Sequence, residues 1–503
     1  MNYDSEEKKN NIIQSQTLSS DEIAISNPKK FVYDGEARQR RLDGGVKLRD
    51  VFIILCAGFA LISDGYQNNV MTMLNSVFTQ KYPKEYTADM KTSVSYASTV
   101  GTIFGQVVIG FAADYMGRKW SIIVATLFLI LGTCMCAASH GKTIDGMLWM
   151  LIISRGVTGF GIGAEYPSSS VSASEAANES VKKRGLVFVL CTNFPLSMGG
   201  PIALCVFLIV YQITSNLDAV WRTMFAIGAF FPLSVFYFRL KMVTSLLYKE
   251  SAIVKQRAPY LLTIRFYWKR MIGTCVSWFL YDFVTFPNGV FSAGIISKVI
   301  NDTSDLQKVA EWNLLLLSIA IPGVFVGGFL MDRIGRKYTL MLGFGGYIVF
   351  GLIVGCAYDK LKAIVPLFII FYGLMQSSGN MGPGNCMGLV SAESFASPVR
   401  GTLYGLSAAI GKVGAVVGTK TFTPIQTNLG DRWTFIIAAI CGLAGITVAY
   451  FFVPHLKEGD LLEQDILYKN YLVEHGWKGH FGLEKTTDDD LESDTVDDFE
   501  SKK

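Results

Sequence analysis

Charged residues are scarce in this chain, and no cysteine lies where it could easily find a partner. Only 17% of the 503 residues are charged, whereas soluble domains carry roughly 25%. All nine cysteines lie inside apolar stretches rather than loops: Cys56, Cys134, Cys136, Cys191, Cys205, Cys275, Cys356, Cys386 and Cys441. We therefore expect no disulfide, no metal site and no cofactor. The mild net charge of +4 gives no indication of nucleic-acid binding.

The first fifty residues lack an apolar core of the length found in signal peptides. We therefore expect no cleaved signal, and the first apolar stretch should direct insertion into the membrane.

The hydrophobic residues are grouped in long apolar blocks. Half of the residues are hydrophobic, and blocks such as 120–138 and 435–453 are long enough to cross a hydrocarbon core of about 30 Å as helices. They are too long for the strands of a membrane barrel. Apolar blocks between charged breaks predict twelve membrane-spanning helices, near 51–74, 93–113, 120–139, 146–170, 185–211, 219–239, 271–297, 312–331, 338–357, 363–389, 401–421 and 433–453. The predicted fold class is thus an all-α membrane protein.

Basic residues lie predominantly on one side of the predicted spans. They are Lys47, Arg49, Arg118, Lys119, Lys182 to Arg184, the Arg239–Arg270 segment, Arg333 to Lys337 and Arg400. Because cytoplasmic loops carry the excess of Lys and Arg, both termini are predicted to be cytoplasmic. The chain then divides into a cytoplasmic tail, a six-helix bundle, a central loop, a second six-helix bundle and an acidic cytoplasmic tail, at 1–49, 50–240, 241–270, 271–455 and 456–503. The basic residues of the central loop are compatible with contact to anionic membrane lipids, but a solvated linker that follows the orientation bias is the favoured interpretation.

An internal repeat relates the two bundles. Gly110-Phe-Ala-Ala-Asp114-Tyr-Met-Gly117-Arg118 follows the second span, and Gly328-Phe-Leu-Met-Asp332-Arg-Ile-Gly335-Arg336 follows the eighth. The two aspartates are 332 − 114 = 218 positions apart, and Glu175 and Glu393 repeat at the same offset (393 − 175 = 218). Each glutamate precedes a basic-Gly step, at Arg184 and Arg400. We expect the glycines to form tight turns, Asp114 and Asp332 to accept hydrogen bonds from amides at the start of the next helix, and Arg118 and Arg336 to hold ion pairs that gate the cytoplasmic side. These duplicated loops resemble the signature of the major facilitator superfamily, which implies two bundles that rock about a site near the bilayer midplane.

Five ionisable residues fall inside predicted spans: Asp64, Arg155, Glu165, Asp282 and Lys412. Because such residues cost at least ~2.5 kcal/mol each on insertion scales, they usually line a cavity. The alternative for each is an inter-helix ion pair or hydrogen bond without a role in transport. That alternative has more weight for Arg155 and Glu165.

Lys412 favours an anionic substrate, because a buried cation needs a counter-ion in one state of the cycle. An ionised Asp282 in the same cavity would repel the anion, and a proton on Asp282 removes that repulsion. Proton and anion then favour each other's binding, which predicts proton–anion symport.

Several motifs resemble those of fungal phosphate:proton symporters. They are Arg155…Gly161-Ile-Gly163-Ala-Glu165-Tyr166-Pro167, Trp278-Phe-Leu-Tyr-Asp282 and Arg400-Gly401…Gly411-Lys412. The resemblance implies that Asp64, Glu165 and Asp282 carry protons. It also implies that Tyr166, Trp278, Asp282 and Lys412 face the phosphoryl group.

The chain departs from phosphate importers at several pocket positions. Phe286 stands where they have Tyr, followed by Pro287-Asn288; Gln67 replaces a carboxylate; Asn385 is shifted by one position; and Asn193 is only a substitute for their Gln. We include Asn193, Phe286, Asn288 and Asn385 as candidate substrate-binding residues. Loss of a phenol and a carboxylate suits a larger phosphodiester with a single charge.

Stretches such as Asp282-Phe-Val-Thr-Phe-Pro287-Asn288-Gly289 are similar to the fungal glycerophosphoinositol permeases. This resemblance implies a plasma-membrane symporter for glycerophosphodiesters. Inorganic phosphate symport and a nutrient receptor that signals without much flux remain alternatives; no nucleophile–base constellation indicates an enzyme. We expect a monomer. Asn301-Asp-Thr303 is a glycosylation sequon on a predicted outer loop.

Overall fold

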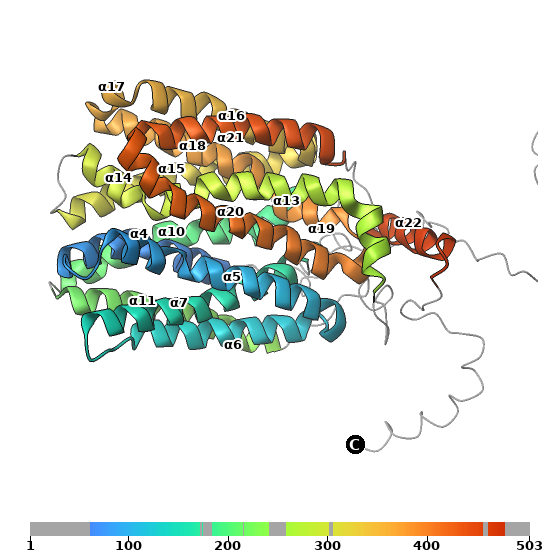
Figure 1. Cartoon of the computed structure of the whole chain (residues 1–503), viewed down its shortest axis with the longest axis horizontal. Helices are drawn as coiled ribbons and strands as arrows, with labels where there is room; N and C mark the ends of the chain where they lie inside the picture. Colours follow the sequence, from blue (N-terminus) through green and yellow to red (C-terminus); the bar gives the residue numbers. More distant parts are fainter. Residues whose placement is uncertain are drawn as a thin grey trace, which may run out of the picture.

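The structure is a computed structural model, and it describes residues 61–171, 174, 184–214, 216–240, 258–300, 305–455 and 461–477. Within this part of the chain the regular elements are all helical. They form two bundles that lie side by side, with α22 (Leu461–Glu474) at one end (Figure 1). The predicted N-terminal tail, most of the central loop, the predicted C-terminal tail except 461–477, Glu175 and Asn301 lie outside the described residues.

The first bundle comprises six helical units, of which two are interrupted. Its elements are α4 (Leu61–Lys81), α5 (Ala88–Met116), α6 (Arg118–Ala137), α7 (Ile144–Glu165) with η1 (Tyr166–Ser170), α9 (Arg184–Cys191) with α10 (Asn193–Ile213), and α11 (Leu217–Leu240).

The second bundle repeats this plan. Its elements are α13 (Tyr260–Val290) with α14 (Ser292–Val299), α15 (Leu306–Arg333), α16 (Arg336–Cys356), the short α17 (Tyr358–Lys362), α18 (Val365–Gly379) with η2 (Asn380–Gly384) and α19 (Asn385–Ser394), η3 (Ser397–Val399), α20 (Arg400–Leu429) and α21 (Arg432–Phe452). Eight of the described helices are long and apolar enough to cross a membrane by themselves, or nine if α13 and α14, bent by 55°, form one span. The twelve helical units agree with the all-α fold that the sequence predicts.

Wide π-helical turns interrupt the fourth helical unit of the first bundle and its counterpart in the second. Both contain a proline, Pro167 in η1 and Pro383 in η2. Proline has no amide hydrogen and its ring clashes with the preceding turn, which favours a wider turn at these two positions. Turns of this kind are frequent at functional sites, and here both face the space between the bundles.

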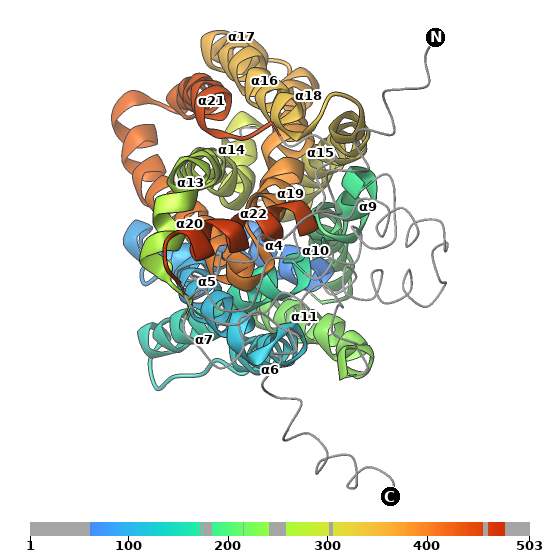
Figure 2. The same ribbon diagram turned by 90° about the vertical axis from the view of Figure 1, so that its right-hand side faces the viewer.

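The two bundles meet along α5 against α20 and along α10 against α15. Figure 2, viewed from the α22 end, shows α5, α6, α7 and α11 on one side and α13, α16, α18 and α21 on the other. The α5–α20 contact is close because glycines form it. A Cβ on Gly405 would lie 2.4 Å from the carbonyl oxygen of Gln106, and one on Gly110 would lie 2.9 Å from that of Gly401.

Helix α13 begins at Tyr260, eleven residues before the predicted start at 271. Its first turns are too polar to read as a membrane span, but they pack on a separate cluster. Tyr267 in α13, Phe395 and Val399 in the α19–α20 link, and Tyr468 and Leu472 in α22 form this cluster. Helix α22 therefore belongs to the fold, although the sequence placed it in an acidic tail.

Candidate functional site

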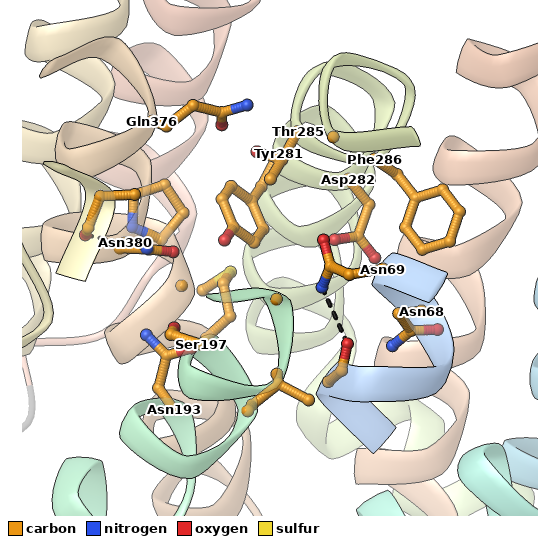
Figure 3. A pocket seen from close by; sticks show the side chains of 18 of the residues that line it. Asn68, Asn69, Asn193, Ser197, Tyr281, Asp282, Thr285, Phe286, Gln376 and Asn380 are labelled. Carbon is orange, nitrogen blue, oxygen red and sulfur yellow. Dashed lines mark hydrogen bonds between the residues drawn. The ribbon is translucent and has the colours of Figure 1, made fainter. Parts of the chain in front are cut away.

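A cavity of about 200 Å³ lies between the two bundles. Polar side chains of α4, α10, α13 and the α18–η2 segment surround it (Figure 3). The polar and aromatic residues of its wall are Asn68, Asn69, Tyr166, Asn193, Ser197, Trp278, Tyr281, Asp282, Thr285, Phe286, Gln376, Asn380 and Lys412. Within the described chain, Asp282 and Lys412 are the two charged residues of this wall.

Asp282 of α13 and Lys412 of α20 form an ion pair across the wall of the cavity. Lys412 Nζ donates to Asp282 Oδ2 at 2.9 Å, and the two side chains are only 6% and 9% exposed. Gly411 makes room for this arrangement, because a Cβ there would lie 2.5 Å from Cδ1 of Trp278. The structure thus brings three of the predicted site residues, Trp278, Asp282 and Lys412, together in the wall of one cavity.

Aromatic rings flank the ammonium group of Lys412. Its Nζ lies 5.8 Å from the ring centroid of Tyr166 and 5.4 Å from that of Phe286. A cation within about 6 Å of an aromatic face is attracted by the ring quadrupole. These two predicted site residues therefore come from opposite bundles and hold the same cation.

A chain of amides supports the opposite wall. Asn193 Nδ2 donates to Asn385 Oδ1 at 2.6 Å, and Asn385 Nδ2 donates to the carbonyl of Val324 at 2.8 Å. Asn193 lines the cavity but Asn385 does not. Asn385 therefore positions Asn193 instead of forming part of the wall as predicted.

Asn288 also lies outside the cavity wall. Its Nδ2 donates to the carbonyl of Val284 within α13, and the hydroxyl of Tyr372 donates to its backbone carbonyl at 2.6 Å. The amide is occupied inside the second bundle, so the expectation of a cavity-facing Asn288 is wrong. Sequence spacing cannot distinguish Asn288 from Phe286, which does line the cavity, because both follow Asp282 by about one or two helical turns.

Residues of the wall that the sequence did not single out include Asn68, Asn69, Tyr281 and Gln376. Asn69 Nδ2 donates to the carbonyl of Gly65 (Figure 3). The sequence could have indicated these residues, because each is a polar residue inside a predicted span. Tyr281 even immediately precedes Asp282.

Glu165 pairs with a cation that the sequence placed elsewhere. Both carboxylate oxygens of Glu165 accept hydrogen bonds from the guanidinium of Arg239, one of them at 3.1 Å, and both residues are almost fully buried. Arg239 also donates to the hydroxyl of Thr126. The sequence counted Arg239 as a cytoplasmic loop residue because it ends an apolar run. Its helix continues to Leu240, however, and the side chain is 1% exposed inside the first bundle.

Asp64 lies near this pair and is fully buried. Neither of its carboxylate oxygens has a hydrogen-bond partner among the described residues. Asp64 interacts electrostatically with Glu165, Arg239 and Tyr166. Tyr166 also interacts electrostatically with Asp282. Tyr166 therefore stands between the buried carboxylates of the first bundle and the ion pair of the cavity.

Arg155 has a structural place. It is buried, and its Nε donates to the carbonyl of Val94 at 3.0 Å, which ties α7 to α5. It does not line the cavity. For this residue the structure supports the inter-helix alternative.

The duplicated aspartates each reach across to the other bundle. The amides of Gly401 and Thr402 at the start of α20 donate to Asp114 at 2.9 and 2.7 Å, and the Thr402 hydroxyl donates at 2.7 Å. The amides of Gly185 and Leu186 at the start of α9 donate to Asp332 at 2.8 and 3.0 Å.

We expected these aspartates to accept from the next helix of the chain, and that detail is wrong. A carboxylate is stabilised at a helix N-terminus because unpaired amides and the helix dipole meet there, and the termini that are available belong to the opposite bundle. These contacts hold the two bundles together at the α22 end.

The remaining motif residues fit a supporting role where they are described. Gly117 and Gly335 have φ of 85° and 87°, a conformation that favours glycine. Arg336 pairs with Glu393 through two contacts of 3.2 Å. Arg400 is fully buried, donates to the carbonyl of Phe395 and lies 3.8 Å from Asp465 of α22. The side chain of Arg118 lies outside the described residues.

Comparison with known proteins places this geometry in a family. The model of the sugar (and other) transporter family matches residues 51–468. Glycerophosphoinositol permease 1 of Candida albicans is 71% identical over 93% of this chain and 91% of the relative. Glycerophosphoinositol transporter 1 of Saccharomyces cerevisiae is 56% identical, with the same coverage. The solved structure of the proton:xylose symporter XylE from E. coli, of the major facilitator superfamily, superposes with a TM-score of 0.72 at 16% identity, over 83% of this chain and 99% of that one.

Proposed function

The chain belongs to the sugar (and other) transporter family and is a multi-pass membrane transporter, and we propose that it imports glycerophosphodiesters together with protons across the plasma membrane. Glycerophosphoinositol is the proposed principal substrate, and glycerophosphocholine a secondary one. The observation that carries the proposal is the Asp282–Lys412 pair in the wall of the cavity.

The pair supplies both an anion site and a means of coupling. Lys412 in this state is neutralised by Asp282, so an incoming phosphodiester must compete with that carboxylate. Protonation of Asp282 removes the competitor and leaves the ammonium to the phosphoryl group, which Tyr166 and Trp278 can flank. The substrate and the proton then bind cooperatively.

The rest of the wall suits a polyhydroxylated head group. Asn68, Asn69, Asn193, Gln376 and Asn380 offer amide donors and acceptors. A cavity of about 200 Å³ is several times the roughly 30 Å³ that one water occupies, so it can hold a ligand much larger than a single water. Phe286 provides an apolar face without a hydroxyl that would favour free phosphate.

Asp64 supports a second proton-binding position. A buried carboxylate without hydrogen-bond partners is costly when ionised, and the nearby cation of Arg239 is already paired with Glu165. A proton on Asp64 removes that cost. Glu165 therefore acts in the proposal through its ion pair with Arg239, and Asp64 carries the proton.

The test is uptake of radiolabelled glycerophosphoinositol by purified protein in liposomes with an imposed pH gradient. We expect accumulation that collapses when the gradient is dissipated, and competition in the order glycerophosphoinositol, glycerophosphocholine, phosphate. Stronger competition by phosphate would favour the alternative of phosphate symport. Binding without flux would support a receptor instead.

A further inference from the structure

A second pocket lies at the end of the bundles opposite α22, the end that the sequence predicts to be extracellular. It has a volume of about 180 Å³ and lies between α5 of the first bundle and α14 and α20 of the second. Its polar residues are Lys91, Thr92, Lys298, Thr423 and Gln426. We call it the outer pocket.

The outer pocket contains a cation without a carboxylate partner. Lys298 pairs with Asp431 at 2.9 Å. Lys91 forms no hydrogen bond or ion pair through its ammonium with any described residue, and its Nζ lies 5.9 Å from the ring centroid of Phe291. Lys298 also acts repulsively on Lys91. A bound anion would relieve this repulsion and supply the missing counter-charge.

One residue of the outer pocket also carries an unused hydrogen-bond donor. The Nε2 atom of Gln426 is buried and has no partner among the described residues. Buried amides normally find a partner, so an orphan donor in a pocket with an unpaired ammonium indicates an acceptor that is absent from the structure. The hydroxyls of Thr92 and Thr423 can add further donors. This set of donors matches the oxygens of a phosphate group.

The outer pocket adjoins the central cavity. Val290 lines the central cavity and the next residue, Phe291, lines the outer pocket. The chain bends by 55° at this point, between α13 and α14. Thr423 of the outer pocket follows Lys412 by eleven residues of α20 (423 − 412 = 11), or about 16 Å along the helix. An anion held beside Lys91 would therefore lie about three helical turns outward from Lys412.

We propose that the outer pocket is a second, weaker binding site that captures the phosphodiester group of the substrate before it enters the central cavity. This inference rests on the proposed function for the identity of the ligand. Capture depends on charge: the single uncompensated cation of Lys91 raises the local concentration of the anion, and salt weakens this effect over a Debye length of about 8 Å.

The first experiment measures initial uptake of radiolabelled glycerophosphoinositol in liposomes by the full chain and by Lys91→Gln. We expect KM to rise about three- to tenfold with kcat unchanged, and the increase of KM with ionic strength to be smaller than in the wild type. Lys91→Arg should restore the wild-type KM. Lys308→Gln is the matched control, because Lys308 is exposed in the first turn of α15 and does not line the pocket.

The second experiment isolates the outer pocket in detergent. Lys412→Ala weakens the central site, and we expect it to retain weak, salt-sensitive binding of glycerophosphoinositol that the double variant Lys91→Gln/Lys412→Ala loses. An unchanged KM in Lys91→Gln, or equal residual binding in the single and double variants, would overturn the inference. If the wild type fails to take up glycerophosphodiesters at all, the proposed function fails instead. The same pair of variants then tests the pocket with inorganic phosphate, and equal binding again overturns it.

Discussion

Replacing Asp282 by Asn should separate substrate binding from proton coupling. The change keeps the size of the side chain and removes the charge that neutralises Lys412 at 2.9 Å. In the wild type, an anion reaches Lys412 only after that carboxylate has been protonated or displaced. In Asp282→Asn the competitor is absent at every pH.

The expected magnitude follows from the geometry. Two charges about 4 Å apart attract each other by about 4 kcal/mol at the effective dielectric constant of 20 that suits partly buried pairs. If new hydrogen bonds offset half of this attraction, about 2 kcal/mol remains, which corresponds to roughly thirtyfold in affinity. We therefore expect Asp282→Asn to bind glycerophosphoinositol about thirtyfold more tightly than the wild type at alkaline pH, and with little dependence on pH.

The assay combines equilibrium binding across pH with two liposome measurements. Exchange of internal for external substrate should persist in Asp282→Asn, whereas accumulation driven by a pH gradient should be lost. Asp282→Glu is the control, because it keeps the charge and should keep both activities in part. If Asp282→Asn still accumulates substrate in response to a pH gradient, or if its affinity follows pH as the wild type does, Asp282 is not the coupling carboxylate.

Two further predictions concern the supporting ion pairs and gates. Asp332→Asn weakens the hydrogen bonds from the amides of Gly185 and Leu186. Because hydrogen bonds to charged groups contribute about 1.5–3 kcal/mol, hydrogen–deuterium exchange at the start of α9 should accelerate at least tenfold. Unchanged exchange would contradict a stabilising role for this contact between the bundles. Glu165→Gln leaves Arg239 as an unpaired buried cation, so thermal unfolding in detergent should show a loss of about 3–5 kcal/mol. Glu165→Gln/Arg239→Met should recover most of that loss, and a double variant as unstable as the single one would show that the pair is not the cause.

The sequence was sufficient for the architecture because lipid imposes a strict rule on it. Every backbone group in the hydrocarbon core must be hydrogen-bonded internally, so long apolar blocks could only be helices, and the repeat at 218 positions set the two bundles. Prediction of the helix boundaries from the sequence failed where helices extend beyond the membrane. Hydropathy predicts that the seventh span begins at residue 271, yet helix α13 begins at Tyr260 because Tyr267 packs on Tyr468 and Phe395.

The site was predictable in its charges but not in its amides. Asp282 and Lys412 are rare residues inside apolar spans, and rarity itself indicated a cavity. Asn193, Asn288 and Asn385 are neutral, and whether such an amide faces a cavity or a neighbouring helix depends on rotation angles that the spacing does not determine. Arg239 was misplaced for a related reason, since a basic residue at the end of an apolar run can lie in a loop or bury itself against a carboxylate.

The contacts between the bundles at the α22 end and the central cavity share helix α20. Asp114 caps the start of α20, and the same uninterrupted helix carries Lys412. Lys412 follows Arg400 by twelve positions, which is about 18 Å along the helix at 1.5 Å per residue. Because no break interrupts this stretch, separation of α20 from Asp114 must tilt or shift Lys412 relative to Tyr166 in the other bundle. Under the proposed function, neutralisation of Lys412 by substrate and release of the Asp114 contact would both act on the position of this one continuous helix. The other contact differs, because Asp332 caps α9 and the chain breaks at Thr192 before α10 and Asn193. The α20 side should accordingly transmit the coupling more directly than the α9 side.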